Sequence, residues 1–149
     1  MKIHTNITKV LQMETVEPKK FIEWNQDFSV GIEELDNHHK ELIHLINSLQ
    51  EAIDADAGVE KIAEVITELF NYANYHFGAE EALFQIRDYP LAQEHCEKHL
   101  EFRKDLAEHR DMVEAEIDFA RLNLLSYLQL WWTNHILQED KKYVAYLSG

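Results

Sequence analysis

The segment from Val59 to Ile86, VEKIAEVITELFNYANYHFGAEEALFQI, determines the fold class of this chain. It contains no proline, and its apolar residues recur every three or four positions, which is the period of one face of an α-helix. The stripe is formed by Ile62, Ile66, Leu69, Ala73, His76 and Glu80. We therefore predict a long helix whose apolar face ends in a polar pair.

Three other segments have the same period, and we expect helices over about residues 33–54, over about 91–114, and from about 118 onward. The run Asp54-Ala55-Asp56-Ala57-Gly58 separates the first two helices, and Arg87-Asp88-Tyr89-Pro90 separates the next two. Such helices with short connections pack as an antiparallel bundle. The sequence therefore predicts an all-α, up-down-up-down four-helix bundle with a non-helical N-terminal arm.

The chain has 149 residues, which favours one domain, and we expect an arm over residues 1–20 and the bundle over 21–149. Its 28 acidic residues exceed its 14 basic residues, giving a formal charge of −14. Such acidity argues against nucleic acid and anionic lipid as partners. No apolar run approaches the length of a membrane span, no secretory signal is apparent, and the single Cys96 fits a reducing compartment. We expect a cytoplasmic monomer.

The nine histidines are the unusual part of the composition. His95 and His99 are four residues apart, as are His76 and Glu80, so each pair shares a helix face. One such pair arises readily by chance, but His39 and His135 also replace apolar residues on core-facing stripes. Burying these imidazoles without partners would cost several kcal/mol, whereas a metal would satisfy them together. The alternatives are hydrogen-bonded core histidines and, for the carboxylates, a solvated acidic face.

Asp140 is the second candidate carboxylate, but a regular helix does not direct it to the same site as His135. The two residues are five positions apart, which separates them by about 140° around an α-helix. We therefore predict that the helix widens into a π-type turn, or ends, between them.

These residues fall into motifs that resemble those of the bacterial hemerythrins. The resemblance covers about residues 21–146. The motifs are Phe28-Ser29-Val30-Gly31-Ile32, Asp36-x-x-His39-Lys40, His76-Phe77-x-x-Glu80-Glu81, Tyr89-Pro90-x4-His95-x3-His99-x2-Phe102 and Trp131-x3-His135-Ile136-x3-Asp140.

The resemblance implies a non-haem diiron centre with two iron ions. One iron would be held by His95, His99 and His135, and the other by His39 and His76. Glu80 and Asp140 would bridge them, leaving a vacant position on the two-histidine iron. By family position, the O2 pocket would be lined by Leu42, Phe77, Trp131, Trp132 and Ile136, with Trp132 standing where the family usually has leucine. His38 is not in this ligand set, and we expect it near the surface or beside a ligand. Cys96 turns away from the neighbouring ligands in the helix, and we expect it to be a buried apolar filler.

The implied function is reversible O2 binding for storage, transport, delivery or scavenging, without enzymatic turnover, with an O2-consuming protein as the candidate recipient. Two alternatives stay open. One is a sensor in which O2 or redox change at the iron alters the arm or the bundle surface. The other is an enzyme of the peroxidase or nitric oxide reductase type.

Overall fold

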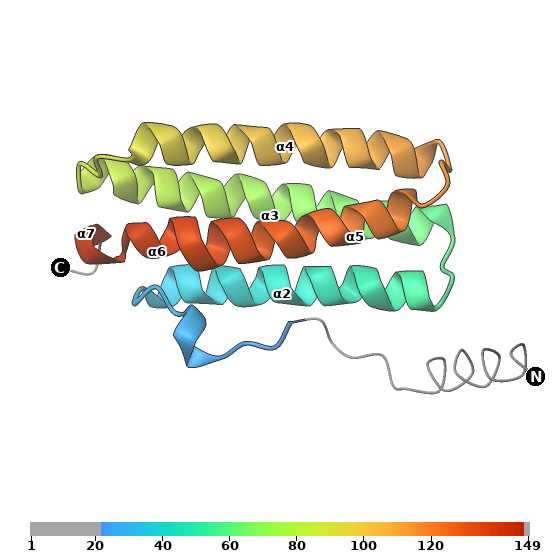
Figure 1. Cartoon of the computed structure of the whole chain (residues 1–149), viewed down its shortest axis with the longest axis horizontal. Helices are drawn as coiled ribbons and strands as arrows, with labels where there is room; N and C mark the ends of the chain where they lie inside the picture. Colours follow the sequence, from blue (N-terminus) through green and yellow to red (C-terminus); the bar gives the residue numbers. More distant parts are fainter. Residues whose placement is uncertain (1–21, 148–149) are drawn as a thin grey trace, which may run out of the picture.

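The computed structural model describes residues 22–147, which contain helices and no strand. The long helices are α2 (Glu33–Asp54), α3 (Val59–Ile86), α4 (Ala92–Glu114) and α5 (Ala120–Trp131). The last continues as η2 (Trp132–Glu139), α6 (Asp140–Lys142) and α7 (Val144–Leu147). Neighbouring helices run antiparallel, and each packs against two others around the bundle (Figure 1). The predicted fold class is confirmed.

The helix ends agree closely with the pattern, except at the start of α5. Asp56 and Asp88, in the two predicted breaks, have left-handed φ angles of 51° and 50°, which interrupt a right-handed helix. We expected the last long helix to begin near residue 118, but it begins at Ala120. Phe119 causes the delay, because its φ of 65° is incompatible with an α-helical turn.

The segment before α2 is extended apart from one short 3-10 turn, η1 (Gln26–Phe28), capped by the Asn25 side chain. Trp24 and Phe28 pack against the core. Asp36, in the first turn of α2, accepts hydrogen bonds from the Ser29 hydroxyl and from the Val30 backbone N–H. These contacts fix the entry of the chain into the bundle. The arm predicted over residues 1–20 lies outside the described residues.

Buried apolar side chains form two clusters. The main core fills most of the bundle and includes Leu49, Leu69 and Leu106. A smaller end cluster consists of Val30, Leu35, Phe84, Tyr89, Tyr143 and Leu147. Buried polar residues come from α2, α3 and α4 and from the segments η2 and α6 that continue α5. They lie between the two clusters, as His39 does between Leu35 and Leu42 on α2. None of the helices in residues 22–147 is long and apolar enough to cross a membrane.

Candidate metal centre

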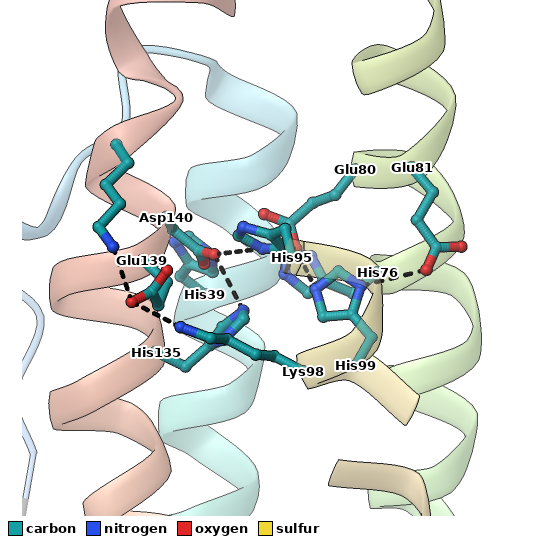
Figure 2. Close-up of polar contacts among 11 residues, drawn as sticks. His39, His76, Glu80, Glu81, His95, Lys98, His99, His135, Glu139 and Asp140 are labelled. Atoms are coloured by element: carbon teal, nitrogen blue, oxygen red, sulfur yellow. Dashed lines mark hydrogen bonds and ion pairs between the residues drawn. The ribbon is translucent and has the colours of Figure 1, made fainter. Parts of the chain in front are cut away.

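Seven ligand-type side chains converge in the layer between the two clusters, each at most 2% exposed. They come from all four sides of the bundle, and Figure 2 shows them pointing toward one another. The set is His39 from α2, His76 and Glu80 from α3, His95 and His99 from α4, His135 from η2, and Asp140 from α6. These are the seven residues that the sequence singled out.

The last helix reaches this layer with two side chains because it widens. Residues Trp132–Glu139 form a π-helix, and the backbone N–H of Asp140 donates to the carbonyl of His135, five residues earlier. The wider turn compensates for the angle that separates the two residues in a regular helix. Asp140 is therefore fully buried beside His135, and the predicted π-type turn is present.

The two carboxylates lie between imidazoles from opposite sides of the layer. Oδ2 of Asp140 is 3.0 Å from Nε2 of His39, and its Oδ1 is 3.0 Å from Nε2 of His95 and 3.1 Å from Nε2 of His135. Oε1 of Glu80 is 3.2 Å from Nε2 of both His76 and His99. Each carboxylate thus faces histidines of two groups, as a bridging ligand would.

The ligand atoms fall into two overlapping groups, in each of which all atoms lie within 4.8 Å of one another. One group contains Glu80, His95, His99 and His135, and the other contains His39, His76, Glu80 and Asp140. Glu80 belongs to both groups, and Asp140 lies close to histidines of both. This arrangement matches one centre with two metals rather than two separate sites.

None of the facing atoms is hydrogen-bonded. The Nε2 atoms of all five histidines and all four carboxylate oxygens are buried without a hydrogen-bond partner. Leaving so many polar atoms unsatisfied would cost far more than a folded domain can tolerate. A hydrogen-bonded core therefore does not explain the layer, whereas metal ions, which accept lone pairs from imidazole and carboxylate together, do.

The electrostatics keep both carboxylates ionised. Burial raises the pKa of Glu80 and of Asp140, and for Asp140 the charge of Glu80 adds to this effect, but the facing imidazoles hold both pKa values below their usual ranges. Burial also tends to lower the pKa of His95, yet its contacts with Asp140 and Glu80 raise that pKa to about 9. The layer thus holds two anionic carboxylates, and their negative charge favours a positive charge at His95.

Outside the layer, two of the histidines have partners for the other ring nitrogen. Nδ1 of His99 is 3.2 Å from Oε1 of Glu81, and Nδ1 of His76 is 2.9 Å from Nδ1 of His38. The sequence anticipated His38 near the surface or beside a ligand, and it marked Glu81 only as the last residue of a family motif, without a role. Nothing in the helical spacing distinguishes Glu81 from an ordinary exposed acid.

Aromatic side chains cover the layer on the side that faces the main core. Phe77 stacks on His99 with ring centroids 3.8 Å apart, and Trp131 stacks on His135 at 4.0 Å. Trp132 is buried, with its ring edge-to-face against His39 at 6.3 Å and against Phe28 at 5.3 Å. Leu42 and Ile136 are fully buried in the main core.

Two buried tyrosines also contact histidines of the centre, and no sequence motif marked either of them as part of the site. Tyr72 stacks on His76 at 5.2 Å, and Tyr143 lies 5.8 Å from the ring of His95. Both hydroxyls lack a hydrogen-bond partner. The pKa of each phenol is raised well above its usual value, mainly by burial and then by the negative charges of Glu80 and Asp140. Both phenols therefore stay protonated.

The fold and the site define a four-helix-bundle protein with a buried cluster of five histidines and two carboxylates, which fits a dinuclear metal centre. A family model described as the hemerythrin HHE cation binding domain matches residues 30–147. The chain belongs to the hemerythrin family. Its His, Glu and Asp cluster fits the non-haem diiron centre of that family.

Relatives and solved structures agree with this placement. A bacteriohemerythrin of Pseudomonas aeruginosa is 37% identical over 81% of this chain and 78% of its own length. A hemerythrin-like protein of Naegleria gruberi is 34% identical over 91% of this chain and its full length. The crystal structure of a hemerythrin mutant, in which a leucine is replaced by tyrosine, superposes with a TM-score of 0.79 at 23% identity. The match covers 88% of this chain and all of that one, which supports the fold.

Proposed function

We propose that this protein binds O2 reversibly at two irons and serves in oxygen storage, transport or delivery. The observation that carries the proposal is the set of buried, unpartnered nitrogens and carboxylate oxygens that face one another between the two apolar clusters. In the proposed ligand set, His95, His99 and His135 hold one iron and His39 and His76 hold the other. Glu80 and Asp140 bridge them.

The composition of this ligand set favours a carrier over an oxidase. Five of the seven proposed ligands are neutral imidazoles, and only Glu80 and Asp140 are anionic. Fewer anionic ligands stabilise high iron oxidation states less strongly, so two ferrous ions held by this set would supply electrons to O2 reversibly. The site holds fewer carboxylates than the diiron proteins with Glu-x-x-His motifs.

Reversible binding also requires that water be kept away from the bound gas. Phe77 and Trp131 cover two of the proposed ligands with stacked rings, while Trp132 covers a third edge-on. Together with Leu42 and Ile136 they are the proposed lining of the O2 pocket. The proposed partner is a protein that consumes O2. We also propose that the protein is a monomer and that it works in a reducing, cytoplasmic compartment, and the unpaired Cys96 supports the second of these proposals.

The test is an oxygen titration of the reduced, iron-loaded protein under anaerobic conditions, followed by removal of the gas. We expect two irons per chain and a spectrum that returns to that of the reduced protein when O2 is removed. Immediate irreversible oxidation would contradict the carrier. Sustained consumption of hydrogen peroxide or nitric oxide with a reductant would support an enzyme instead.

A further inference from the structure

His38 occupies a position on α2 beside the metal centre that the proposed ligand set does not use. Its side chain is 15% exposed and is held edge-to-face against Tyr75 at 4.9 Å and against His76 at 5.1 Å. Its Nδ1 lies 2.9 Å from Nδ1 of His76. Adjacent residues on a helix point about 100° apart, so His38 faces α3 while His39 faces the centre.

The roles of the atoms in this contact follow from the chemistry of His76. To bind a metal through Nε2, the imidazole must keep a lone pair there and carry its proton on Nδ1. The Nδ1–H of His76 then donates to Nδ1 of His38, which must be an acceptor. His38 therefore carries its own proton on Nε2, which lies 4.0 Å from Oε1 of Glu34.

We propose that His38 is a positioning residue that fixes the tautomer and ring orientation of His76, and so strengthens the hold on the two-histidine iron. The inference rests on the ligand set proposed above. Partners of this kind raise the basicity of a ligating imidazole and limit its rotation. Here the partner is a second imidazole, which lies between the ligand and the exposed carboxylate of Glu34.

The contact matters more because the same iron has no other support of this type among the described residues. Nδ1 of His39, the second proposed histidine ligand of that iron, is buried without a hydrogen-bond partner. On the three-histidine side, Glu81 supports His99. Removing the acceptor at His38 would thus weaken one iron selectively, because the partner of His99 stays in place.

Two variants of nearly equal shape separate hydrogen bonding from packing. His38→Asn retains an oxygen close to the position of Nδ1, whereas His38→Leu fills the same space without an acceptor. In chelator competition under anaerobic conditions, we expect His38→Leu to raise the dissociation constant of one of the two ferrous ions about 10- to 100-fold, and His38→Asn to stay within about threefold of the wild type. The control is His44→Leu, an exposed position on the same helix, which should leave both constants unchanged.

Equal constants in His38→Leu and the wild type would overturn the proposal, as would the same loss in His38→Leu and His38→Asn. A second measurement does not depend on the folding of any variant. In nitrogen-15 NMR spectra of the zinc-loaded wild type, His38 should be the Nε2–H tautomer, and an Nδ1–H tautomer would also overturn the proposal. The test of His38 measures iron binding without O2, so it does not depend on the result of the O2 titration. If O2 oxidised the wild type irreversibly, the proposed function would fail, but the role of His38 could still be tested.

Discussion

The main core and the metal-binding layer are both fully buried, yet they are stabilised in different ways. In the main core, residues such as Leu69 and Phe102 bury only apolar surface, which stabilises the fold by about 25 cal/mol for each Å² removed from water. In the layer, nine nitrogen and oxygen atoms of the seven proposed ligands face one another without hydrogen bonds. The main core is stabilised by the side chains of the protein alone, whereas the polar atoms of the layer are satisfied only when metal ions bind to them.

This contrast explains how a bundle can hold a buried polar centre. The main core ties the four helices together along most of their length, and the end cluster ties them again beyond the centre. The layer is therefore held in shape from both sides. The following predictions test this division, in order of decreasing effect.

Removing the metal should lower stability most. Because metal binds the folded state, stripping the reduced protein of iron should lower the free energy of unfolding by about 4 kcal/mol, the value for a ligand at a thousand times its dissociation constant. Circular dichroism should nevertheless show most of the helix content retained. Complete loss of helix on chelation would mean that the two apolar clusters cannot hold the bundle alone.

Leu69→Ala should lower stability in the main core without affecting the centre. The truncation leaves a cavity around a fully buried position and should lower the free energy of unfolding by about 2–5 kcal/mol. The loss should be equal with and without iron, and the iron content should stay at two per chain. Denaturant titrations of both forms measure it, and a loss of iron would show that the regions are coupled.

Trp132→Leu should affect both regions, since this ring lies where they meet. The smaller side chain leaves space beside His39 and should lower the free energy of unfolding by about 1–3 kcal/mol. Water entering that space should also speed irreversible oxidation of the O2-bound form. The oxidation rate in air, followed by absorbance, checks this, and an unchanged rate would remove Trp132 from the proposed pocket lining.

Asp140→Asn should affect the metal far more than the fold. The amide keeps the shape but removes one of the two anionic ligands, so at least one iron should be lost. The metal-free variant should differ from the metal-free wild type by less than about 2 kcal/mol, because the neutral group is cheaper to bury. Iron analysis and denaturant titration measure the two effects. Two irons in this variant would contradict the bridging assignment.

Tyr127→Phe should give the smallest change, on the edge of the main core. Its hydroxyl donates to Asp105 at 3.1 Å, and losing this bond should cost about 1 kcal/mol. Burial, followed by the charge of Asp105, raises the pKa of Tyr127 well above 10.0. The unfolded phenol ionises first as pH rises, so this contribution is present below about pH 10 and is lost above it. Denaturant titrations at about pH 7 and about pH 10.5 should show a smaller decline for the variant.

The arrangement of the helices and the identity of the clustered residues were predictable because both depend on spacing along single helices. The stripe on α3 ends in His76 and Glu80 at the period that also places them in one layer. Even the widened turn was predictable, since His135 and Asp140 cannot share a face otherwise. Each of these inferences needs only the geometry of one helix.

Other features depend on how one helix is rotated against its neighbour, which spacing does not determine. The contact between His38 and His76 joins α2 to α3, and the stacking of Phe77 on His99 joins α3 to α4. The late start of α5 has a local cause, the positive φ of Phe119. The sequence gives no sign of it, because glycine and asparagine, and not phenylalanine, are the residues that usually adopt such a φ. The arm over residues 1–20 and the domain limits remain predictions.

The π-helix bears on the evolution of such a chain. One extra residue in a helix rotates everything after it by about 100°, so the wide turn sets the facing of Tyr143 as well as that of Asp140. Tyr143 is fully buried against Phe84 and Tyr89, on the side of the centre away from the main core. A single inserted residue can thus supply a ligand and close the end of the bundle in one step. Deleting a residue between 136 and 139 would disturb both.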